Sequence, residues 1–441
     1  MRRLMTAALA VFLVGMPAQA QDRLIQLGWL WDVGTDELTR LRPMPEFWSA
    51  AAVVGARFVV SPVHEGNGSA RLGYLDTVTG AVGFVPGVSL DWPDPSVSDA
   101  PALAADPRRS RVFIWHGRTI VEVSESSGVR VVVPDVETPP LRCFGCRGFS
   151  TRRLAYSAAA DVVMFLQPGQ SDPTIDDIVV ARVATGEIVR RFATAGTVSN
   201  LSADVSTTRV IITSMWNGLG VPPSLNSTLQ VFDAPDGSVT QSPYAPPYNY
   251  GGPALDETNH RLLFSHAGGV VATDDAGAML GELTTGTTRQ VTYVTGVSAA
   301  SGRTFVQSYF GGGTYTTPGP CLLHVVERSG QALAPIDLSA RVGRQDGRCD
   351  RGILLTPPGS PGVPVATING RHVVLSWTHP GNVEAFELEV RIGVAAIVWP
   401  VGADATTTFA DVPPGTYGVR VRGRNAVGVG AWSALTAITV P

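Results

Sequence analysis

Two stretches of sequence decide the fold, Tyr74-Leu75-Asp76-Thr77-Val78-Thr79-Gly80 and Val231-Phe232-Asp233-Ala234-Pro235-Asp236-Gly237. Each runs from alternating apolar residues into a turn that ends in glycine, and a second alternating stretch follows. Alternation favours half-buried strands, and Asp and Gly favour the turn conformation. Looser copies of this pattern end at Gly34, Gly128, Gly186, Gly286 and Gly330. The chain therefore repeats a strand–turn–strand unit with a period of roughly fifty residues.

A second element recurs between these copies, in which an Asp is followed five residues later by an Arg and a β-branched run. It occurs at Asp106 with Arg111, Asp204 with Arg209, and Asp256 with Arg261. Each period thus holds four short strands, which is typical of a propeller blade.

The combined pattern resembles the YVTN-type repeat of bacterial β-propellers over roughly residues 22 to 357. The resemblance implies an all-β, seven-bladed propeller over residues 22–356, with six and eight blades as alternatives. We expect residues 24–31 and 37–43 to form the third and fourth strands of a shared blade. Residues 341–355 would then supply its first two strands, so that no sheet edge stays open. In one blade, the turn at Asp274-Asp275-Ala276-Gly277 competes with the turn that ends at Gly286.

The first twenty residues have the pattern of a secretory signal. Arg2 and Arg3 precede the apolar run from Leu4 to Met16, and Ala18-Gln19-Ala20 fits a cleavage site. A membrane anchor is the alternative, although the run is short for a bilayer about 30 Å thick. We expect a secreted or periplasmic mature chain without a transmembrane segment.

A second domain follows a Pro/Gly-rich linker at residues 357–362. Val373-Val374-Leu375-Ser376-Trp377 places a Trp where a sandwich buries its core aromatic. Pro413-Pro414-Gly415-Thr416-Tyr417-Gly418-Val419-Arg420-Val421-Arg422 resembles a characteristic run of fibronectin type III domains. The resemblance implies an immunoglobulin-like sandwich over residues 363–441, in which the Tyr417 hydroxyl bonds to the backbone.

Charge and composition exclude several classes of function. The formal net charge is −4, which argues against a nucleic-acid partner. The chain contains no lysine, so it has neither a Schiff-base lysine nor a P-loop lysine. It also lacks a G-x-S-x-G elbow and an H-E-x-x-H motif. Asp172, Asp176 and Asp177 lack the spacing of an EF-hand, so we expect a solvated acidic loop rather than a calcium site.

The four cysteines suit an exported protein. We expect Cys143 to pair with Cys146, and Cys321 with Cys349. A redox or zinc site at the Cys143-x-x-Cys146 motif is the alternative.

Loop lengths indicate where a binding site would lie. Connections between second and third strands, and between successive blades, are expected to be long and to share one face, where binding usually resides. Aromatic and amide side chains there would suit sugars or peptides, although packing within their own loops is the alternative. The predicted ligand-binding residues are Trp92, Trp216, Asn217, Tyr244, Tyr248, Tyr250 and Tyr309.

Three histidines of that face suggest a second kind of site. His116 and His266 each follow the repeat's Arg by five residues, and His64 follows Arg57 by seven. Together they could hold a divalent metal, with ordinary polar loop histidines as the alternative.

The sequence therefore predicts an exported, non-enzymatic binding or scaffolding protein without a cofactor, whose partner is an extracellular protein or carbohydrate. The alternative is a metal-dependent propeller hydrolase or lyase, similar to the gluconolactonase-like and streptogramin-lyase-like families. The sequence leaves the oligomeric state open.

Overall fold

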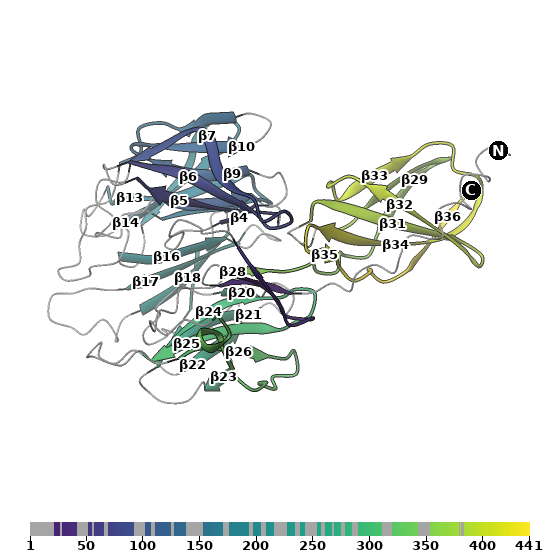
Figure 1. Cartoon of the computed structure of the whole chain (residues 1–441). Helices are drawn as coiled ribbons and strands as arrows, with labels where there is room; N and C mark the ends of the chain where they lie inside the picture. The colour runs from purple at the N-terminus through teal and green to yellow at the C-terminus, as the bar shows by residue number, and fades with distance from the viewer. Residues whose placement is uncertain are drawn as a thin grey trace.

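The computed structural model of the 441-residue chain is shown in Figure 1. It describes residues 22–26, 29–41, 52–54, 57–65, 69–91, 102–106, 111–124, 128–137, 153–170, 176–193, 197–203, 209–215, 227–233, 239–242, 254–256, 261–266, 269–274, 278–284, 290–310, 320–342, 353–378, 380 and 383–441.

Residues 22–355 contribute seven four-stranded antiparallel sheets to the described part of the chain, here numbered 1 to 7. Sheet 1 joins both ends of this region: β28 (Ile353–Leu355), β1 (Arg23–Gln26), β2 (Trp29–Asp32) and β3 (Glu37–Arg40). Sheet 2 contains β4 (Ala52–Val54), β5 (Phe58–His64), β6 (Ser69–Asp76) and β7 (Val82–Asp91). Sheet 3 contains β8 (Leu103–Asp106), β9 (Arg111–His116), β10 (Thr119–Ser124) and β11 (Gly128–Val133).

The remaining four sheets repeat this order. Sheet 4 contains β12 (Leu154–Ser157), β13 (Val162–Pro168), β14 (Asp176–Arg182) and β15 (Ile188–Ala193). Sheet 5 contains β16 (Thr197–Ala203), β17 (Arg209–Met215), β18 (Ser227–Asp233) and β19 (Val239–Ser242). Sheet 6 contains β20 (Ala254–Asp256), β21 (Arg261–His266), β22 (Gly269–Asp274) and β23 (Met279–Thr284). Sheet 7 contains β24 (Gln290–Val297), β25 (Thr304–Phe310), β26 (Cys321–Val326) and β27 (Ile336–Asp337), and the short helix α1 (Leu338–Val342) follows it.

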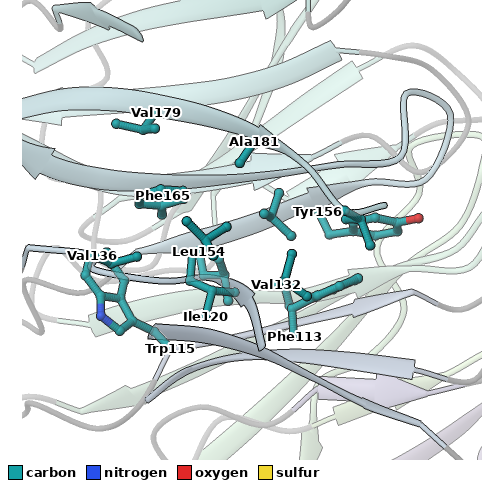
Figure 2. Packing of buried hydrophobic residues seen from close by; sticks show 14 residues of the cluster. Phe113, Trp115, Ile120, Val132, Val136, Leu154, Tyr156, Phe165, Val179 and Ala181 are labelled. Atoms are coloured by element: carbon teal, nitrogen blue, oxygen red, sulfur yellow. The ribbon is translucent and has the colours of Figure 1, made fainter. Parts of the chain in front are cut away.

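Sheets 2 and 3, and sheets 3 and 4, pack face to face, and their first strands, β4 with β8 and β8 with β12, contact one another. Between sheets 3 and 4, Trp115 and Phe165 are fully buried, with ring centroids 6.0 Å apart (Figure 2). Full burial of each such ring contributes about 1.5–3 kcal/mol. A further apolar core joins sheet 7 to sheet 1, where Phe305 packs with Leu24 and Trp31. Radial packing of four-stranded sheets makes this part of the chain a β-propeller.

The repeated glycines occupy backbone positions that favour glycine. Gly80, Gly128, Gly186 and Gly330 all have positive φ, between 65° and 87°, and lie in or beside the turn that joins third and fourth strands. The prediction that a turn ending at Gly286 joins the third and fourth strands of its blade is wrong. In sheet 6, β22 ends at Asp274 and β23 begins at Met279, so the competing turn joins these strands and Gly286 follows the sheet.

The Asp–Arg spacing of five marks the hairpin between first and second strands. Asp106 pairs with Arg111 in the β8–β9 register, and Asp256 pairs with Arg261 in the β20–β21 register. The ion pairs close at 2.8 Å from Arg111 Nε and at 2.9 Å from Arg261 Nε.

Ring closure differs from the sequence prediction. The N-terminal segment contributes three strands of sheet 1, because residues 24–31 form a hairpin of β1 and β2 rather than a single strand. Among the described residues of the C-terminal segment, β28 is the strand that joins sheet 1, and it pairs antiparallel to β1. Residues 341 and 342, the start of the segment expected to be extended, belong to the short helix α1 instead. The prediction that both chain ends share one sheet is confirmed.

The C-terminal region is a two-sheet sandwich. One sheet contains β29 (Val365–Asn369), β30 (His372–Ser376) and β33 (Thr406–Phe409). The other contains β32 (Ala395–Val401), β31 (Ala385–Ile392), β34 (Gly415–Asn425), β35 (Gly428–Val429) and β36 (Thr436–Val440). Trp377 packs on Phe386 in the core at 5.3 Å between centroids. Tyr417 Oη donates to the Pro413 carbonyl at 2.7 Å, which confirms the bond expected for this tyrosine.

The sandwich is docked against the propeller (Figure 1). Val427 packs into an apolar cluster with Val59 and Leu75 of sheet 2 and with Leu355 of β28. Asn425 Nδ2 donates to the carbonyl of Thr356 at 2.9 Å, directly after β28. Burial raises the pKa of Glu384 of the sandwich above its usual range, although the positive charge of Arg57, directly before β5, favours the charged carboxylate.

Candidate functional site

The antiparallel sheets give the propeller two unlike rims. Turns between first and second strands and between third and fourth strands lie on one rim, here called the short-turn rim; Asp106, Arg111 and Asp76 mark it. Connections between second and third strands, and between successive sheets, leave from the opposite rim, here called the long-loop rim; His64 and His116 mark it. Leu75 and Val427 share one apolar cluster and the charge of Arg57 acts on Glu384, so the sandwich lies at the short-turn rim.

Three histidines end equivalent strands at the long-loop rim. His64 is the last residue of β5, His116 of β9 and His266 of β21. The prediction that His116 and His266 lie in long connections is wrong. Only Gly117 and Arg118 separate β9 from β10, and β22 begins at Gly269. The Thr119 hydroxyl donates to the carbonyl of His116 at 3.0 Å, so this hairpin is tight.

Metal ligation by these histidines stays a prediction. The described part of the chain contains no group of three or more His, Cys, Asp or Glu side chains suited to a metal ion. The side chains of His64 and His266 lie outside that part.

The predicted aromatic ligand-binding residues fall mainly outside the described ranges. Trp92, Trp216, Asn217, Tyr244, Tyr248 and Tyr250 all do so. Tyr309 belongs to β25 near the end of that strand, at the long-loop rim, although its side chain is not described. The structure places at the long-loop rim the ends of the strands that flank these connections.

Sheet 4 shows how one long connection is anchored. Asp176 and Asp177 are buried at the start of β14, so the prediction that they lie in a solvated loop is wrong for these two residues. Asp177 Oδ2 accepts the backbone N–H of Gln170 at 3.1 Å across the base of the connection. Arg191 pairs with Asp177 at 3.6 Å. Burial lowers the pKa of Arg153 despite the nearby charge of Asp176.

Sheet 7 contains a buried pair that the sequence interpretation missed. Ser308 Oγ lies 2.8 Å from Nε2 of His324, and burial lowers the pKa of this imidazole. Neither side chain is exposed, so the pair links β25 to β26 rather than meeting a substrate. An imidazole within the apolar run Cys321-Leu322-Leu323-His324-Val325-Val326 is the sequence signal for a buried strand histidine.

A cluster of linked charged side chains lies at the short-turn rim between sheets 3 and 4. Arg111 is only 7% exposed and donates to Asp106, to the Tyr156 hydroxyl at 2.7 Å and to Asp161 at 2.6 Å. It also pairs with Glu122 at 3.4 Å. Burial alone would lower the pKa of Arg111, because it disfavours the charged guanidinium. The interactions with Asp106, Tyr156 and Asp161 favour the charged form more strongly, and the pKa of Arg111 lies above its ordinary value. Burial, followed by the charge of Asp106, raises the pKa of Tyr156. Because its donors and acceptors are matched, we interpret this cluster as structural.

Cys321 is buried and disulfide-bonded. Cys143, Cys146 and Cys349 lie outside the described residues, so both pairings stay predictions.

In the parts of the chain that the structure describes, there is no helix of sufficient length and apolarity to cross a bilayer.

Comparisons with known proteins concern the fold. No protein-family model and no curated protein matches the sequence. The structure of TolB from Acinetobacter baumannii is 11% identical, covers 63% of this chain and 67% of its own, and has a TM-score of 0.41. BamB from Moraxella catarrhalis is 13% identical, covers 89% of this chain and 94% of its own, and has a TM-score of 0.41. The sixth fibronectin type III domain of human fibronectin type III domain containing protein 3 is 23% identical, with coverage of 19% and 86% and a TM-score of 0.18. At TM-scores below 0.5, these similarities do not bear on what the chain binds.

Proposed function

We propose that this chain is an exported, non-enzymatic binding or scaffolding protein that recognises a glycan or a protein through the long-loop rim. In this proposal residues 1–20 are a signal peptide, and sheets 1 to 7 over residues 22–356 are the blades of a seven-bladed propeller. Residues 357–362 are the linker, and residues 363–441 are a fibronectin type III domain. Export to the periplasm or beyond agrees with disulfide bonding at Cys321.

One observation carries the proposal: the two rims differ in what they can present. The sandwich docks through Val427 against sheet 2 and β28 at the short-turn rim, so the long-loop rim faces away from that contact. Long connections such as residues 216–226 and 243–253 leave from this rim on a scaffold of packed sheets. Binding residues are disproportionately carried by loops that a rigid scaffold positions.

The proposed contacts are the Tyr and Trp side chains of these connections. Tyr and Trp bring large rigid surfaces with a polar edge at low entropy cost, which suits sugars and peptides. A paired substitution of Tyr248 and Tyr250 by alanine tests them, with Trp399→Ala as the control. Trp399 is also an exposed aromatic, but it lies on β32 of the sandwich.

The experiment is a glycan and peptide array probed with the mature protein, followed by titration of each hit. We expect the paired substitution to weaken the hit about tenfold or more and Trp399→Ala to leave it unchanged. An array without hits, or hits indifferent to the paired substitution, would contradict the proposal.

The second candidate is a metal-dependent hydrolase or lyase at the same rim. The observation that favours it is that His64, His116 and His266 end equivalent second strands. Metal analysis after mild purification tests it. A stoichiometric metal content in the wild-type protein that decreases in the His116→Ala variant would support this candidate, and a wild-type protein without metal would contradict it.

A further inference from the structure

A partly open cavity of about 560 Å³ lies between sheets 2 and 3, close to the short-turn rim. Its walls come from facing strands of the two sheets, and most of the lining is apolar: Phe58, Leu72, Tyr74, Val112, Val123 and Val129. The cavity is separate from the long-loop rim and from the contact with the sandwich, because Val427 packs on Val59 and Leu75, whose side chains belong to the other face of sheet 2.

An irregularity of β7 explains why the two sheets do not close here. Phe84 pairs with Gly73 and Ser89 pairs with Arg71, so the segment between Phe84 and Ser89 faces Leu72 alone. Pro86 has no N–H for the ladder, and Gly87 adopts a φ of 73°. Such bulges displace the outer strand locally. Val85 and Pro86 consequently line the cavity instead of continuing the sheet.

The polar groups of the cavity set the chemistry of a ligand. The Asp76 carboxylate is already engaged by Arg57 at 2.9 Å and by the N–H groups of Val78 and Thr79. It therefore offers no unmatched charge to a cation. The Tyr74 ring stands edge-on to Phe58, with centroids 6.1 Å apart. Tyr74 and Ser124, the other polar residues of the lining, each carry a hydroxyl, a group that can donate to or accept from a ligand.

Gly83 of β7 permits this position of Tyr74. A Cβ at Gly83 would lie 2.8 Å from both Cζ and Oη of Tyr74, so any larger residue would displace the ring.

From these features we propose that the cavity binds a small, uncharged, mainly apolar molecule that carries one hydroxyl or carbonyl group. Its volume lies within the 300–1,000 Å³ or so of small-molecule pockets, which are typically apolar with a few polar groups that fix orientation. Entry is possible from the rim, where Ala81 and Gly128 are exposed and Val129 is 47% exposed. This site is independent of the proposed function.

The test uses 2-naphthol and naphthalene as probes of the mature full-length protein. Val129→Trp fills the mouth of the cavity at an exposed position. Val131→Trp is the matched control, since Val131 is 55% exposed on the same strand and does not line the cavity. Ala81→Trp is a second blocking variant for the case in which V129W lowers Tm. Binding is followed by fluorescence titration of 2-naphthol and by competition with naphthalene.

We expect both probes to bind the wild-type protein, and V129W or A81W to weaken both by about tenfold or more, whereas V131W leaves them unchanged. Tyr74→Phe should weaken 2-naphthol by about 2- to 10-fold and spare naphthalene, because a single hydrogen bond is lost. The proposal is overturned if neither probe binds, or if folded V129W and A81W bind as the wild type does.

Discussion

Replacing Arg111 by methionine tests the interpretation that the cluster at the short-turn rim is structural. The substitution keeps an apolar stem of similar length and removes the guanidinium that links four side chains of sheets 3 and 4. Two of its partners, Asp106 and Glu122, are buried carboxylates. Their desolvation is the source of the expected loss of stability.

The magnitude follows from what each partner retains. Removing one member of a buried ion pair costs about 3–5 kcal/mol. Glu122 keeps Arg130 at 2.6 Å, and the Asp161 side chain is 37% exposed and can hydrate. Asp106 is the most deeply buried of the three carboxylates, with a side chain 1% exposed, so we place most of the cost there, near the lower limit of about 3 kcal/mol. In a domain of this size that corresponds to a fall in Tm of roughly 5 °C or more.

Arg261→Met is the matched control, because Arg261 occupies the same hairpin position in sheet 6. Asp256 is as buried as Asp106, with both side chains 1% exposed, but the Arg261 side chain is 28% exposed against 9% for Arg111. Water can therefore enter part of the space that the guanidinium leaves, and we expect a smaller loss than for Arg111→Met. Thermal unfolding monitored by circular dichroism compares the two variants.

The explanation also predicts that Asp106→Asn, added to the Arg111→Met variant, recovers part of the lost Tm, because it removes the buried charge. Equal losses for Arg111→Met and Arg261→Met, or no recovery from Asp106→Asn, would refute the reasoning.

Three further predictions concern stability. Gly186→Ala should lower the free energy of unfolding by about 3 kcal/mol or more, because φ is +72° and the new Cβ would overlap the Val132 carbonyl. Gly80→Ala is the control: φ is +68° but no atom lies near the new Cβ, so the cost should be about 1–2 kcal/mol, and equal changes in Tm for the two variants would contradict the prediction. Burial lowers the pKa of His324 in the folded state, so the unfolded chain binds this proton more readily than the folded chain does. Stability should therefore fall as the pH drops from about 6.5 through the folded pKa. When Tm is measured from pH 7.5 to 5, the decline should be smaller for His324→Gln than for the wild type. Tyr417→Phe should cost the sandwich about 1 kcal/mol in urea unfolding, and an unchanged midpoint would argue against the tyrosine bond.

The sequence predicts those parts of the fold that local chemistry determines. The positive φ at Gly80 and Gly186 follows from turns that only glycine adopts without strain, so the repeated glycines locate third-to-fourth strand turns. The Asp–Arg spacing likewise specifies a hairpin register, as Asp106 and Arg111 demonstrate.

A single glycine does not by itself locate a turn. Gly28 lies between β1 and β2, but most residues of the segment 24–31 are apolar on both sides of it, so periodicity alone does not reveal that hairpin. Gly117, with a φ of 55°, and Arg118 form the whole connection between β9 and β10. Two residues interrupt the apolar pattern only briefly, so the pattern does not distinguish this tight turn from a longer connection. The cavity beside Tyr74 depends on how β7 leaves its partner strand, which no sequence period encodes.

The contact between Asn425 and Thr356 has a mechanical consequence. Strand β28 ends at Leu355, and Thr356 connects it to the linker at residues 357–362. The same three-residue strand pairs with β1 and so joins the two ends of the propeller. Tension applied at the C-terminus would therefore travel through the sandwich to the seam of the propeller. Val427 lies in one apolar cluster with Leu355 and with residues of sheet 2. Part of the force would therefore pass to sheet 2, which reduces the force that separates β28 from β1.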